Sequence, residues 1–363
     1  MIFNSLSDLP RPLPMPDLET YENEAKIRLQ KYSATNLNYE LFKKNKRLVS
    51  PKYLPTKLDI ENLSRCNFRC IMCQVSEWPK GQRAEDLSLH EFKHIIDENI
   101  GLLEIKLQGM GEPTLGRDDF FAMIKYARDL NIWVRTVTNG SLLHANDNIR
   151  KFVESGVNEI QISIDGATKE TFESIRKGSK FERVIENVTN LNNHAESMGK
   201  NITKMWTVVQ EKNLNELSDL IDLAKKMNFK SMVFSLDIVD WGNTDWTEKN
   251  KEISVNNEFN IKLANELYEK GEDLGIKVTF WNIAQKYETS SPELLCQWPF
   301  ERSYVSSDNR VVPCCMIADP DTFEIKSSGS FVETWKSDEY QEFRKSHLDG
   351  NIPKVCENCY KLK

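Results

Sequence analysis

Short apolar runs alternate with longer amphipathic stretches along the chain from residue 57 onward. The runs have the length of buried strands, and the stretches between them place apolar residues at the spacing of a helix face. Strands are predicted at residues 57–62, 102–108, 132–137, 159–164, 205–209 and 231–236. Helices are predicted at residues 88–99, 119–130, 146–155, 167–198 with a break near Gly178, 214–227 and 256–273. These successive strand and helix units predict an α/β fold, in which a parallel sheet with right-handed crossovers curls into a partial (β/α)6 barrel of the TIM type.

The segments on either side of this region differ from it in composition. Residues 1–55 are rich in Pro, Asn and Lys and predict an irregular or partly helical extension without a core of its own. The barrel is expected to occupy residues 56–285. Residues 286–363 are long enough for one small additional domain.

Three cysteines, Cys66, Cys70 and Cys73, follow the first predicted strand. Three thiolates can hold three irons of a [4Fe–4S] cubane and leave the fourth iron open, where a small molecule can chelate it. A zinc site needs four ligands, and no fourth Cys or His lies close by in the sequence. The loop therefore predicts a catalytic iron-sulfur cluster.

Other distinctive residues also follow predicted strands. Residues 109–113 (Gly-Met-Gly-Glu-Pro) follow the second strand, residues 138–140 (Thr-Asn-Gly) end the third, and residues 163–166 (Ser-Ile-Asp-Gly) end the fourth. Any one of these is ordinary turn chemistry. The carboxyl ends of parallel strands meet on one face of a barrel, so this order after a three-cysteine loop predicts a shared active site.

Composition narrows the classes of function. The eight cysteines cluster at residues 66–73, 296–315 and 356–359, which indicates metal sites, and the N-terminus has no basic region followed by an apolar run. A reducing cytoplasm is therefore expected. No stretch approaches the roughly 18 apolar residues that span a bilayer, so no membrane partner is expected. The net charge of −7, with mixed signs throughout, provides no basic field for nucleic acid.

The spacing Cys-x3-Cys-x2-Cys, together with the three motifs after it, resembles that of the radical S-adenosylmethionine (SAM) enzymes over residues 57–240. In that family, SAM chelates the open iron of the [4Fe–4S] cluster through its amino and carboxylate groups. One electron from the cluster cleaves SAM to methionine and a 5′-deoxyadenosyl radical, which abstracts a hydrogen atom from the substrate. The resemblance also implies a low-potential electron donor such as flavodoxin or ferredoxin.

The same resemblance implies roles for individual residues in binding SAM. Glu112 stands in the glycine-rich motif that binds the methionine amino group, while Ser163 and Asp165 match positions that face the ribose and methionine moieties. Arg176 is a candidate partner of the carboxylate. Met72 takes the position that packs against adenine, where a polarizable thioether suits an aromatic face. The full implied set is Met72, Gly111, Glu112, Asn139, Ser163, Asp165 and Arg176.

Five further cysteines lie near the C-terminus, and the last two have the spacing Cys-x2-Cys. Zinc knuckles and iron-sulfur sites share that spacing, so the spacing alone leaves both open. The surrounding sequence resembles the SPASM or twitch extension of radical SAM enzymes, which implies an auxiliary [4Fe–4S] cluster. The full form uses seven cysteines for two clusters. This chain stops four residues after Cys359, so the shorter form with one cluster is expected. Its implied ligands are Cys296, Cys314, Cys356 and Cys359.

Cys315 has no implied ligand role and is a candidate catalytic residue. A free thiol can return a hydrogen atom to a substrate radical, which gives net epimerisation. If the radical instead loses an electron to the auxiliary cluster and a proton to a base, the outcome is a two-electron oxidation. A structural thiol packed beside the cluster is an equal alternative, because free Cys is commonly a small core residue.

The cysteine spacing and the single extra cluster resemble most the aminocyclitol dehydrogenase of aminoglycoside biosynthesis. This implies an oxidoreductase that acts on a polar small molecule such as a sugar or aminocyclitol. The alternative enzyme is a maturase of ribosomally made peptides. Residues 1–55 are short for the leader-binding module of such maturases, although that module can be a separate chain. A Cys315-dependent epimerase and a non-catalytic zinc-binding scaffold are further alternatives.

Two other patterns have structural explanations. Residues 90–94 match the His-Glu-x-x-His pattern of zinc peptidases. However, the apolar stripe of the predicted helix puts both histidines on the opposite, solvated face, and Ser88 with Glu91 makes a capping box. Trp241 and Trp246 follow the sixth strand and are expected to pack against the C-terminal domain or to line the substrate entrance.

Overall fold

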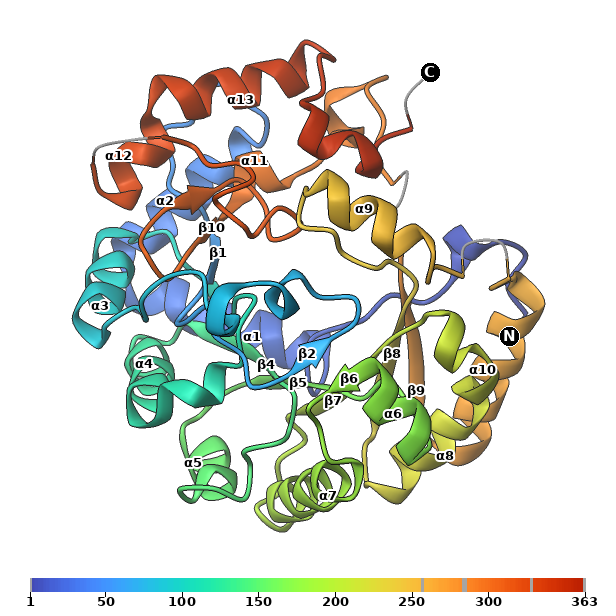
Figure 1. The fold of residues 1–363 in the computed structure, drawn as a ribbon. Helices are drawn as coiled ribbons and strands as arrows, with labels where there is room; N and C mark the ends of the chain where they lie inside the picture. The colour runs from blue at the N-terminus through green and yellow to red at the C-terminus, as the bar shows by residue number, and fades with distance from the viewer. Residues whose placement is uncertain (1, 256–257, 283–285, 327–328, 362–363) are drawn as a thin grey trace.

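A single curved sheet of nine strands forms the centre of this computed structural model, which describes residues 2–255, 258–282, 286–326 and 329–361 (Figure 1). Neighbouring strands are parallel except at one edge, where the last two are antiparallel. From that edge to the other, the strands are β11 (Val311–Val312), β10 (Arg302–Val305), β1 (Lys57–Ile60), β3 (Glu104–Leu107), β4 (Trp133–Thr138), β5 (Glu159–Ser163), β7 (Thr203–Val208), β8 (Ser231–Ser235) and β9 (Lys277–Trp281).

The predicted partial barrel is confirmed. The six predicted strands are present as β1, β3, β4, β5, β7 and β8, and their ends differ from the prediction by at most two residues. The prediction lacked β9, although its sequence alternates Val278 and Phe280, both buried, with more polar neighbours. That alternation is the period of a strand with one face on the core.

Helices cover the outer face of the curved sheet (Figure 1). They are α3 (Leu89–Glu98), α4 (Arg117–Asp129), α5 (Asn148–Glu154), α7 (Phe181–Ser197), α8 (Leu217–Lys226) and α10 (Ile261–Leu274). No helix among the described residues is long and apolar enough to cross a bilayer.

Two predicted helices differ most from the observed ones. The stretch predicted at 167–198 divides into α6 (Lys169–Ile175) and α7, with the short strand β6 (Arg176–Lys177) between them. The break falls at Gly178, whose φ of +89° suits a residue without a side chain. For the helix predicted from 256, residues 256 and 257 lie outside the described residues. Helix α10 begins after Asn260, whose side chain accepts a hydrogen bond from the amide of Leu263 at 3.0 Å.

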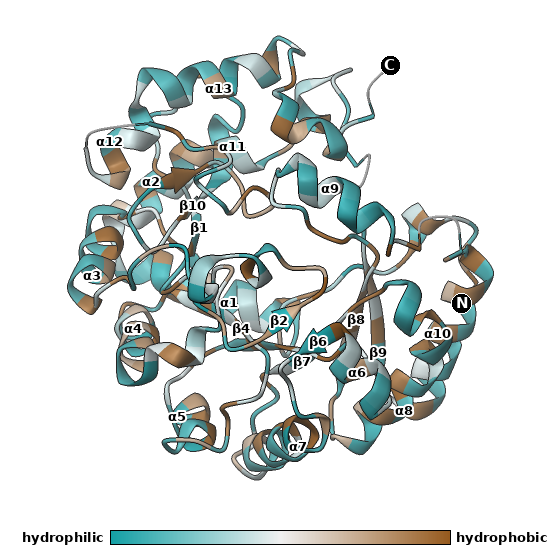
Figure 2. Ribbon diagram, in the orientation of Figure 1, coloured by the Kyte–Doolittle hydropathy of each residue, from teal (hydrophilic) through white to brown (hydrophobic). Residues whose placement is uncertain are grey.

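The two faces of the barrel strands differ in polarity. Residues that point outward, such as Leu58, Ile105 and Ile162, are fully buried and form one core with the helices. Figure 2 shows hydrophobic residues on the sheet-facing sides of the outer helices and hydrophilic residues on their outer sides. Because successive side chains of a strand alternate in direction, the charged residues of these strands point into the barrel.

The N-terminal residues pack on the outside of the barrel. They contain helices α1 (Leu18–Lys31) and α2 (Ser33–Lys44). Phe3, Leu9 and Phe42 are buried in the same core as the barrel helices. The guanidinium of Arg28 also donates to the backbone carbonyls of Leu102 and Leu130. This segment is therefore bound to the barrel and has no separate interior.

The C-terminal residues continue the barrel sheet. Strand β10 pairs with β1 in parallel, which places it next to the strand that precedes the cysteine loop. Helices α11 (Trp298–Glu301), α12 (Phe331–Lys336) and α13 (Asp338–Leu348) then cover that side of the molecule. Trp335 in α12 is 0% exposed, and its indole nitrogen donates to the carbonyl of Tyr53 at 2.9 Å. The domain boundary expected at residue 285 lies outside the described residues.

We predict that Trp335→Ala lowers the free energy of unfolding by about 3–5 kcal/mol, because it removes a fully buried aromatic side chain and leaves a carbonyl without its donor. Urea unfolding of the metal-free protein measures the effect. His90→Ala, at an exposed position, is the control and should change the free energy of unfolding by less than about 0.5 kcal/mol. A loss below about 1 kcal/mol for Trp335→Ala would contradict the packing described here.

Candidate active site

The cysteine loop leaves the carboxyl end of β1 and folds back over it. The amide of Cys66 donates to the carbonyl of Gly81 at 3.2 Å, which closes the base of the loop. Cys70 lies in the short strand β2 (Arg69–Cys70), directly opposite Arg176 of β6. The amide of Cys73 donates to the carbonyl of Cys70 at 3.1 Å, so the chain turns back between them. The three thiols lie within electrostatic range of one another.

Of these thiols, that of Cys70 is buried and those of Cys66 and Cys73 are partly buried. Burial raises the pKa of Cys66 to about 12, and it also raises the pKa of Cys70 and of Cys73 above the ordinary value. Arg176 places its Nη1 atom 4.0 Å from the sulfur of Cys70, but one guanidinium does not balance three thiolates. Iron would supply the missing positive charge and displace the thiol protons. The site therefore fits a metal centre that binds deprotonated cysteines.

The described side chains do not converge on a site for a single metal ion. Within the described part of the chain, no three Cys, His, Asp or Glu side chains converge closely enough to hold one metal ion. A cubane needs a wider set, because each of its ligands binds a different iron. The absence of such a group among the described residues therefore does not count against a [4Fe–4S] cluster.

The glycine-rich motif after β3 lies against the cysteine loop. A Cβ atom at Gly111 would lie 2.5 Å from the carbonyl oxygen of Arg65, so this position needs a glycine. The amide of Glu112 donates to the same carbonyl at 2.9 Å. The close approach brings the second and first strand ends together, as the order of motifs predicts.

The carboxylate of Glu112 binds groups of the protein itself. The side chain is 2% exposed. It accepts hydrogen bonds from the Oγ1 atom of Thr138 and the amide of Asn139, both at 2.7 Å, and from Oγ1 of Thr114 at 2.6 Å. Asn139 in turn donates from Nδ2 to Oδ1 of Asn67 in the cysteine loop at 2.9 Å. Glu112 and Asn139 thus connect the ends of β3 and β4 to the cysteine loop.

Asp165 and Arg176 form a buried ion pair beside Cys70. Arg176 Nη2 lies 2.6 Å from Asp165 Oδ2, while Asp165 Oδ1 accepts from the amide of Val208 at 2.8 Å. Burial raises the pKa of Asp165, and the neighbouring guanidinium opposes that shift. Ser163 ends β5 on the same side of the sheet, and Met72 is buried in the core beneath the loop. The roles of these residues toward SAM stay predictions.

The C-terminal cysteines gather around one apolar cluster, which we name the C-terminal cluster. It consists of Tyr287, Leu295, Cys296, Trp298 and Tyr360, and Cys314, Cys315, Cys356 and Cys359 pack against it. Backbone contacts hold its parts together: the amide of Tyr287 donates to the carbonyl of Cys359, and the amide of Cys296 donates to the Tyr360 hydroxyl, both at 2.9 Å. Burial raises the pKa of the Cys359 thiol to about 12 and that of Cys356 well above its ordinary value.

A second apolar cluster joins the two cysteine groups, and we name it the bridging cluster. It consists of Val75, Met110, Tyr304, Val312, Ile317 and Ala318. Cys66 and Cys73 from the first group pack against it, as do Cys314 and Cys315 from the second. Cys314 and Cys315 therefore lie between the two clusters. The sequence predicted the two groups but carried no signal for their proximity.

A row of charged residues crosses the inside of the barrel. Asp59, Lys106, Arg135 and Glu159 are direct neighbours in the register of β1, β3, β4 and β5. TIM barrel interiors are usually filled by branched apolar side chains, so this interior is unusually polar. Burial lowers the pKa of Lys106, and the charges of Asp59 and Cys315 oppose that shift. The sequence analysis did not identify these residues as part of the barrel interior. The available signal was the alternation of charged residues with Leu and Ile in strands predicted to be buried.

The remaining patterns have the structural roles that the sequence suggests. His90 and His94 are exposed, and Ser88 and Glu91 form the expected capping box of α3. Trp241 packs against the bridging cluster, next to residues from the C-terminal segment, and Trp246 is buried in α9 (Thr244–Lys251). The interpretation that these tryptophans pack on the C-terminal domain is therefore supported for Trp241.

The fold and the two cysteine groups together define a barrel protein built to hold iron-sulfur clusters. Residues 63–235 match the family model of the radical SAM superfamily, and residues 296–360 match that of the iron-sulfur cluster-binding SPASM domain. Residues 63–235 are thus similar to radical SAM domains, and residues 296–360 are similar to SPASM domains. The first implies a catalytic [4Fe–4S] cluster and SAM, and the second implies auxiliary iron-sulfur clusters.

Several characterised proteins are similar to this chain. The AdoMet-dependent heme synthase of Methanosarcina barkeri is 33% identical over 186 residues, 50% of this chain and 50% of that protein. Mycofactocin maturase MftC of Mycobacterium tuberculosis (strain H37Rv) is 26% identical over 313 residues, 84% of this chain and 75% of MftC. MftC of Mycolicibacterium smegmatis is 30% identical over 174 residues, which cover 42% of it. The chain thus spans about half the length of the first and third of these relatives.

Among solved structures, Streptococcus suis SuiB bound to the precursor peptide SuiA superposes with a TM-score of 0.66 at 16% identity. The superposition covers 89% of this chain and 74% of SuiB. At this level of identity, the similarity establishes the shared fold.

We predict about eight irons per chain after anaerobic reconstitution of the wild type, and about four for the triple variant Cys66→Ala, Cys70→Ala, Cys73→Ala. Iron and sulfide analysis measures both. The double variant His90→Ala, His94→Ala is the control and should keep the wild-type iron content. A wild type with only about four irons, all lost in the triple variant, would show that the C-terminal cysteines hold no cluster.

Proposed function

We propose that this protein is a radical SAM maturase that oxidises a ribosomally made peptide, with the C-terminal cysteines holding the cluster that accepts an electron from the substrate. The observation that carries the proposal is the bridging cluster. It packs against Cys66 and Cys73 on one side and Cys314 and Cys315 on the other. Two redox centres held on one apolar cluster are arranged for a two-electron oxidation.

Two of the similar proteins, the maturase MftC and SuiB, support a peptide substrate over the small polar molecule suggested by the cysteine spacing. The similarity to mycofactocin maturase MftC extends over 84% of this chain and therefore over both domains. The fold shared with SuiB binds a precursor peptide in that protein. We therefore take the peptide as the principal substrate class.

We assign the following roles in this reaction to residues of the chain. Cys66, Cys70 and Cys73 would hold the catalytic cluster, which together with SAM would supply the radical chemistry that removes one hydrogen atom from the substrate. Glu112 would hold the glycine-rich loop where the loop backbone can bind the methionine amino group. Arg176, paired with Asp165, would supply positive charge near Cys70 for the SAM carboxylate.

Other predicted contacts complete this arrangement. Met72 would pack against the adenine, Ser163 and Asp165 would face the ribose and methionine moieties, and Asn139 would hold the cysteine loop through Asn67. The C-terminal ligands would be Cys296, Cys314, Cys356 and Cys359. The electron that starts each turnover would come from a flavodoxin or ferredoxin.

The balance of the oxidation is two electrons and two protons. The substrate would lose one hydrogen atom through the SAM chemistry, and it would then lose one electron to the auxiliary cluster and one proton to a base. Cys315 lies between the two apolar clusters and in range of Lys106. In an oxidation its thiol is structural, whereas in an epimerisation it would return a hydrogen atom to the substrate radical.

One observation favours a second candidate, oxidation of a sugar or aminocyclitol. The row of Asp59, Lys106, Arg135 and Glu159 makes the barrel interior polar, and a polyol or amine would find hydrogen-bonding partners there. The two candidates share the same chemistry and differ in the substrate.

The reconstituted protein, SAM and dithionite can be incubated with a panel of peptides encoded near its gene and a panel of aminocyclitols. We expect a peptide to lose two hydrogen atoms in mass for each 5′-deoxyadenosine formed. Conversion of an aminocyclitol alone would favour the second candidate, and loss of 5′-deoxyadenosine formation in the Cys66, Cys70, Cys73 triple variant is the control.

We predict that Cys315→Ala still yields the dehydrogenated product, with no solvent deuterium in the substrate recovered from D2O. The reason is that the substrate radical would give its electron to the auxiliary cluster and would not take a hydrogen atom from a thiol. Mass spectrometry of product and recovered substrate measures both outcomes. Uptake of one deuterium by the wild type that disappears in Cys315→Ala would instead assign an epimerase.

A further inference from the structure

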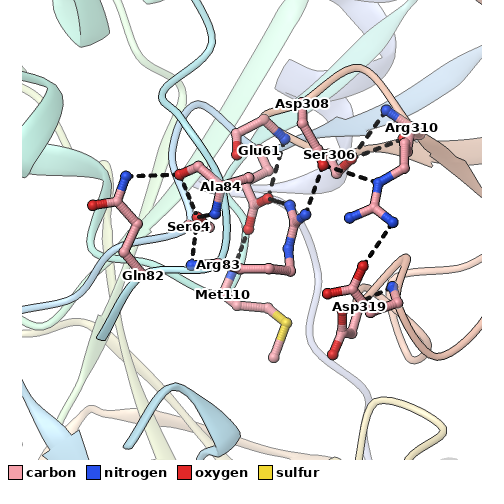
Figure 3. Close-up of polar contacts among 12 residues, drawn as sticks. Glu61, Ser64, Gln82, Arg83, Ala84, Met110, Ser306, Asp308, Arg310 and Asp319 are labelled. Carbon is pink, nitrogen blue, oxygen red and sulfur yellow. Dashed lines mark hydrogen bonds and ion pairs between the residues drawn. The ribbon is translucent and has the colours of Figure 1, made fainter. Parts of the chain in front are cut away.

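A chain of charged side chains, buried at one end, joins the end of β1 to the turn between β10 and β11, and the proposed chemistry does not use it (Figure 3). Its centre is Glu61, whose side chain is 0% exposed. Glu61 Oε1 accepts a hydrogen bond from the amide of Met110 at 3.0 Å, and Oε2 accepts one from the amide of Ser307 at 3.1 Å. One carboxylate therefore holds the glycine-rich loop and the C-terminal domain at the same time.

Arg83 supplies the positive charge that this carboxylate needs. Its Nη2 atom lies 2.9 Å from Glu61 Oε2, and its Nη1 atom lies 2.9 Å from Asp308 Oδ2. The hydroxyl of Ser64 accepts from the amides of Arg83 and Ala84 at 3.2 and 2.9 Å, which holds the exit of the cysteine loop in place. Arg83 is 4% exposed, so salt in solution screens these pairs weakly.

The chain of charges continues into the C-terminal segment that contains Cys314 and Cys315. Asp308 also pairs with Arg310 at 2.9 Å, and Arg310 reaches Asp321 at 2.7 Å. A second link starts in the cysteine loop, where Gln74 donates from Nε2 to Oδ2 of Asp319 at 2.8 Å. The cysteine loop and the C-terminal domain are thus joined by polar contacts as well as by the bridging cluster.

The glycine-rich loop reaches this position only because Gly109 has no side chain. A Cβ atom there would lie 2.2 Å from Cγ of Glu61. The Glu61 side chain occupies that space, and the next amide, that of Met110, points at its carboxylate. A displacement of Glu61 therefore displaces the backbone that leads to Gly111 and Glu112.

We infer that Glu61, Arg83 and Asp308 form a positioning element that fixes the glycine-rich loop, and with it the SAM site, against the C-terminal domain. The inference rests on the proposed function, because it takes the glycine-rich loop as part of that site. The three residues touch neither SAM nor substrate in this scheme. Buried ion pairs add little stability compared with apolar packing, and their best-attested use is to specify one arrangement of the parts they join.

Asp308→Asn tests the inference with a small change. Asp308 is 28% exposed and the substitution keeps its shape, so the variant leaves the Glu61 and Arg83 pair in place. We expect the Kd for SAM, measured by calorimetry on the reconstituted protein, to rise roughly threefold to tenfold. We also expect SAM to produce a smaller change in the electron paramagnetic resonance spectrum of the reduced cluster.

Two further variants separate positioning from stability. Arg83→Lys keeps the charge but loses the two-pronged geometry, so its Kd for SAM should rise as well, while its iron content stays at the wild-type value. Asp86→Asn is the matched control. It removes a carboxylate from the same loop, where Asp86 pairs with Arg65 at 2.6 Å with both side chains partly exposed. Its Kd should equal that of the wild type.

The outcomes distinguish this inference from the function on which it rests. The positioning role is overturned if the wild type binds SAM and the Asp308→Asn and Arg83→Lys variants bind it with the same Kd. This holds even if the melting temperatures of the variants fall. A reconstituted wild type that does not bind SAM would overturn the proposed function itself.

Discussion

The parallel pairing of β10 with β1 is the contact on which the arrangement of both cysteine groups depends. It extends the barrel sheet with residues that are about 245 positions away in sequence, and it places the C-terminal segment beside the strand that leads to the cysteine loop. Trp281, on the opposite edge strand β9, packs against the C-terminal cluster. The C-terminal segment therefore contacts both edges of the open sheet.

Packing a cysteine-rich segment against the sheet has an energetic consequence. Thiols packed among apolar and aromatic side chains stay protonated without a metal, because burial raises the pKa of Cys314 and Cys356 well above the ordinary value. Metal binding and folding are coupled in such sites, since the ligands must lose protons and the positive charge must come from the metal. The same side chains that exclude water from the thiols also shield a cluster from solvent, which tunes its potential.

The charged side chains inside this protein either lie opposite one another on neighbouring strands or form connected ion pairs. Asp59, Lys106, Arg135 and Glu159 lie opposite one another across four strands, so each charge has a neighbour of opposite or balancing sign. The Glu61 carboxylate uses the same principle between two domains, with backbone amides as well as a guanidinium as donors. Uncompensated buried charges would be costly, and these arrangements compensate them while keeping the barrel interior polar.

The amino-acid pattern predicted the local features: six barrel strands, the helices between them, the three-cysteine loop, and the capping box at Ser88. Each depends on neighbours within a few residues, and periodicity and spacing report such neighbours directly. Which distant residues meet became visible in the folded chain alone. Neither the strand register that aligns Asp59 with Lys106 nor the pairing of Glu61 with Ser307 follows from local pattern. The physical reason is that parallel pairing and burial join segments that are far apart in the sequence. These contacts form only when the whole chain has folded, so no short stretch of sequence reports them.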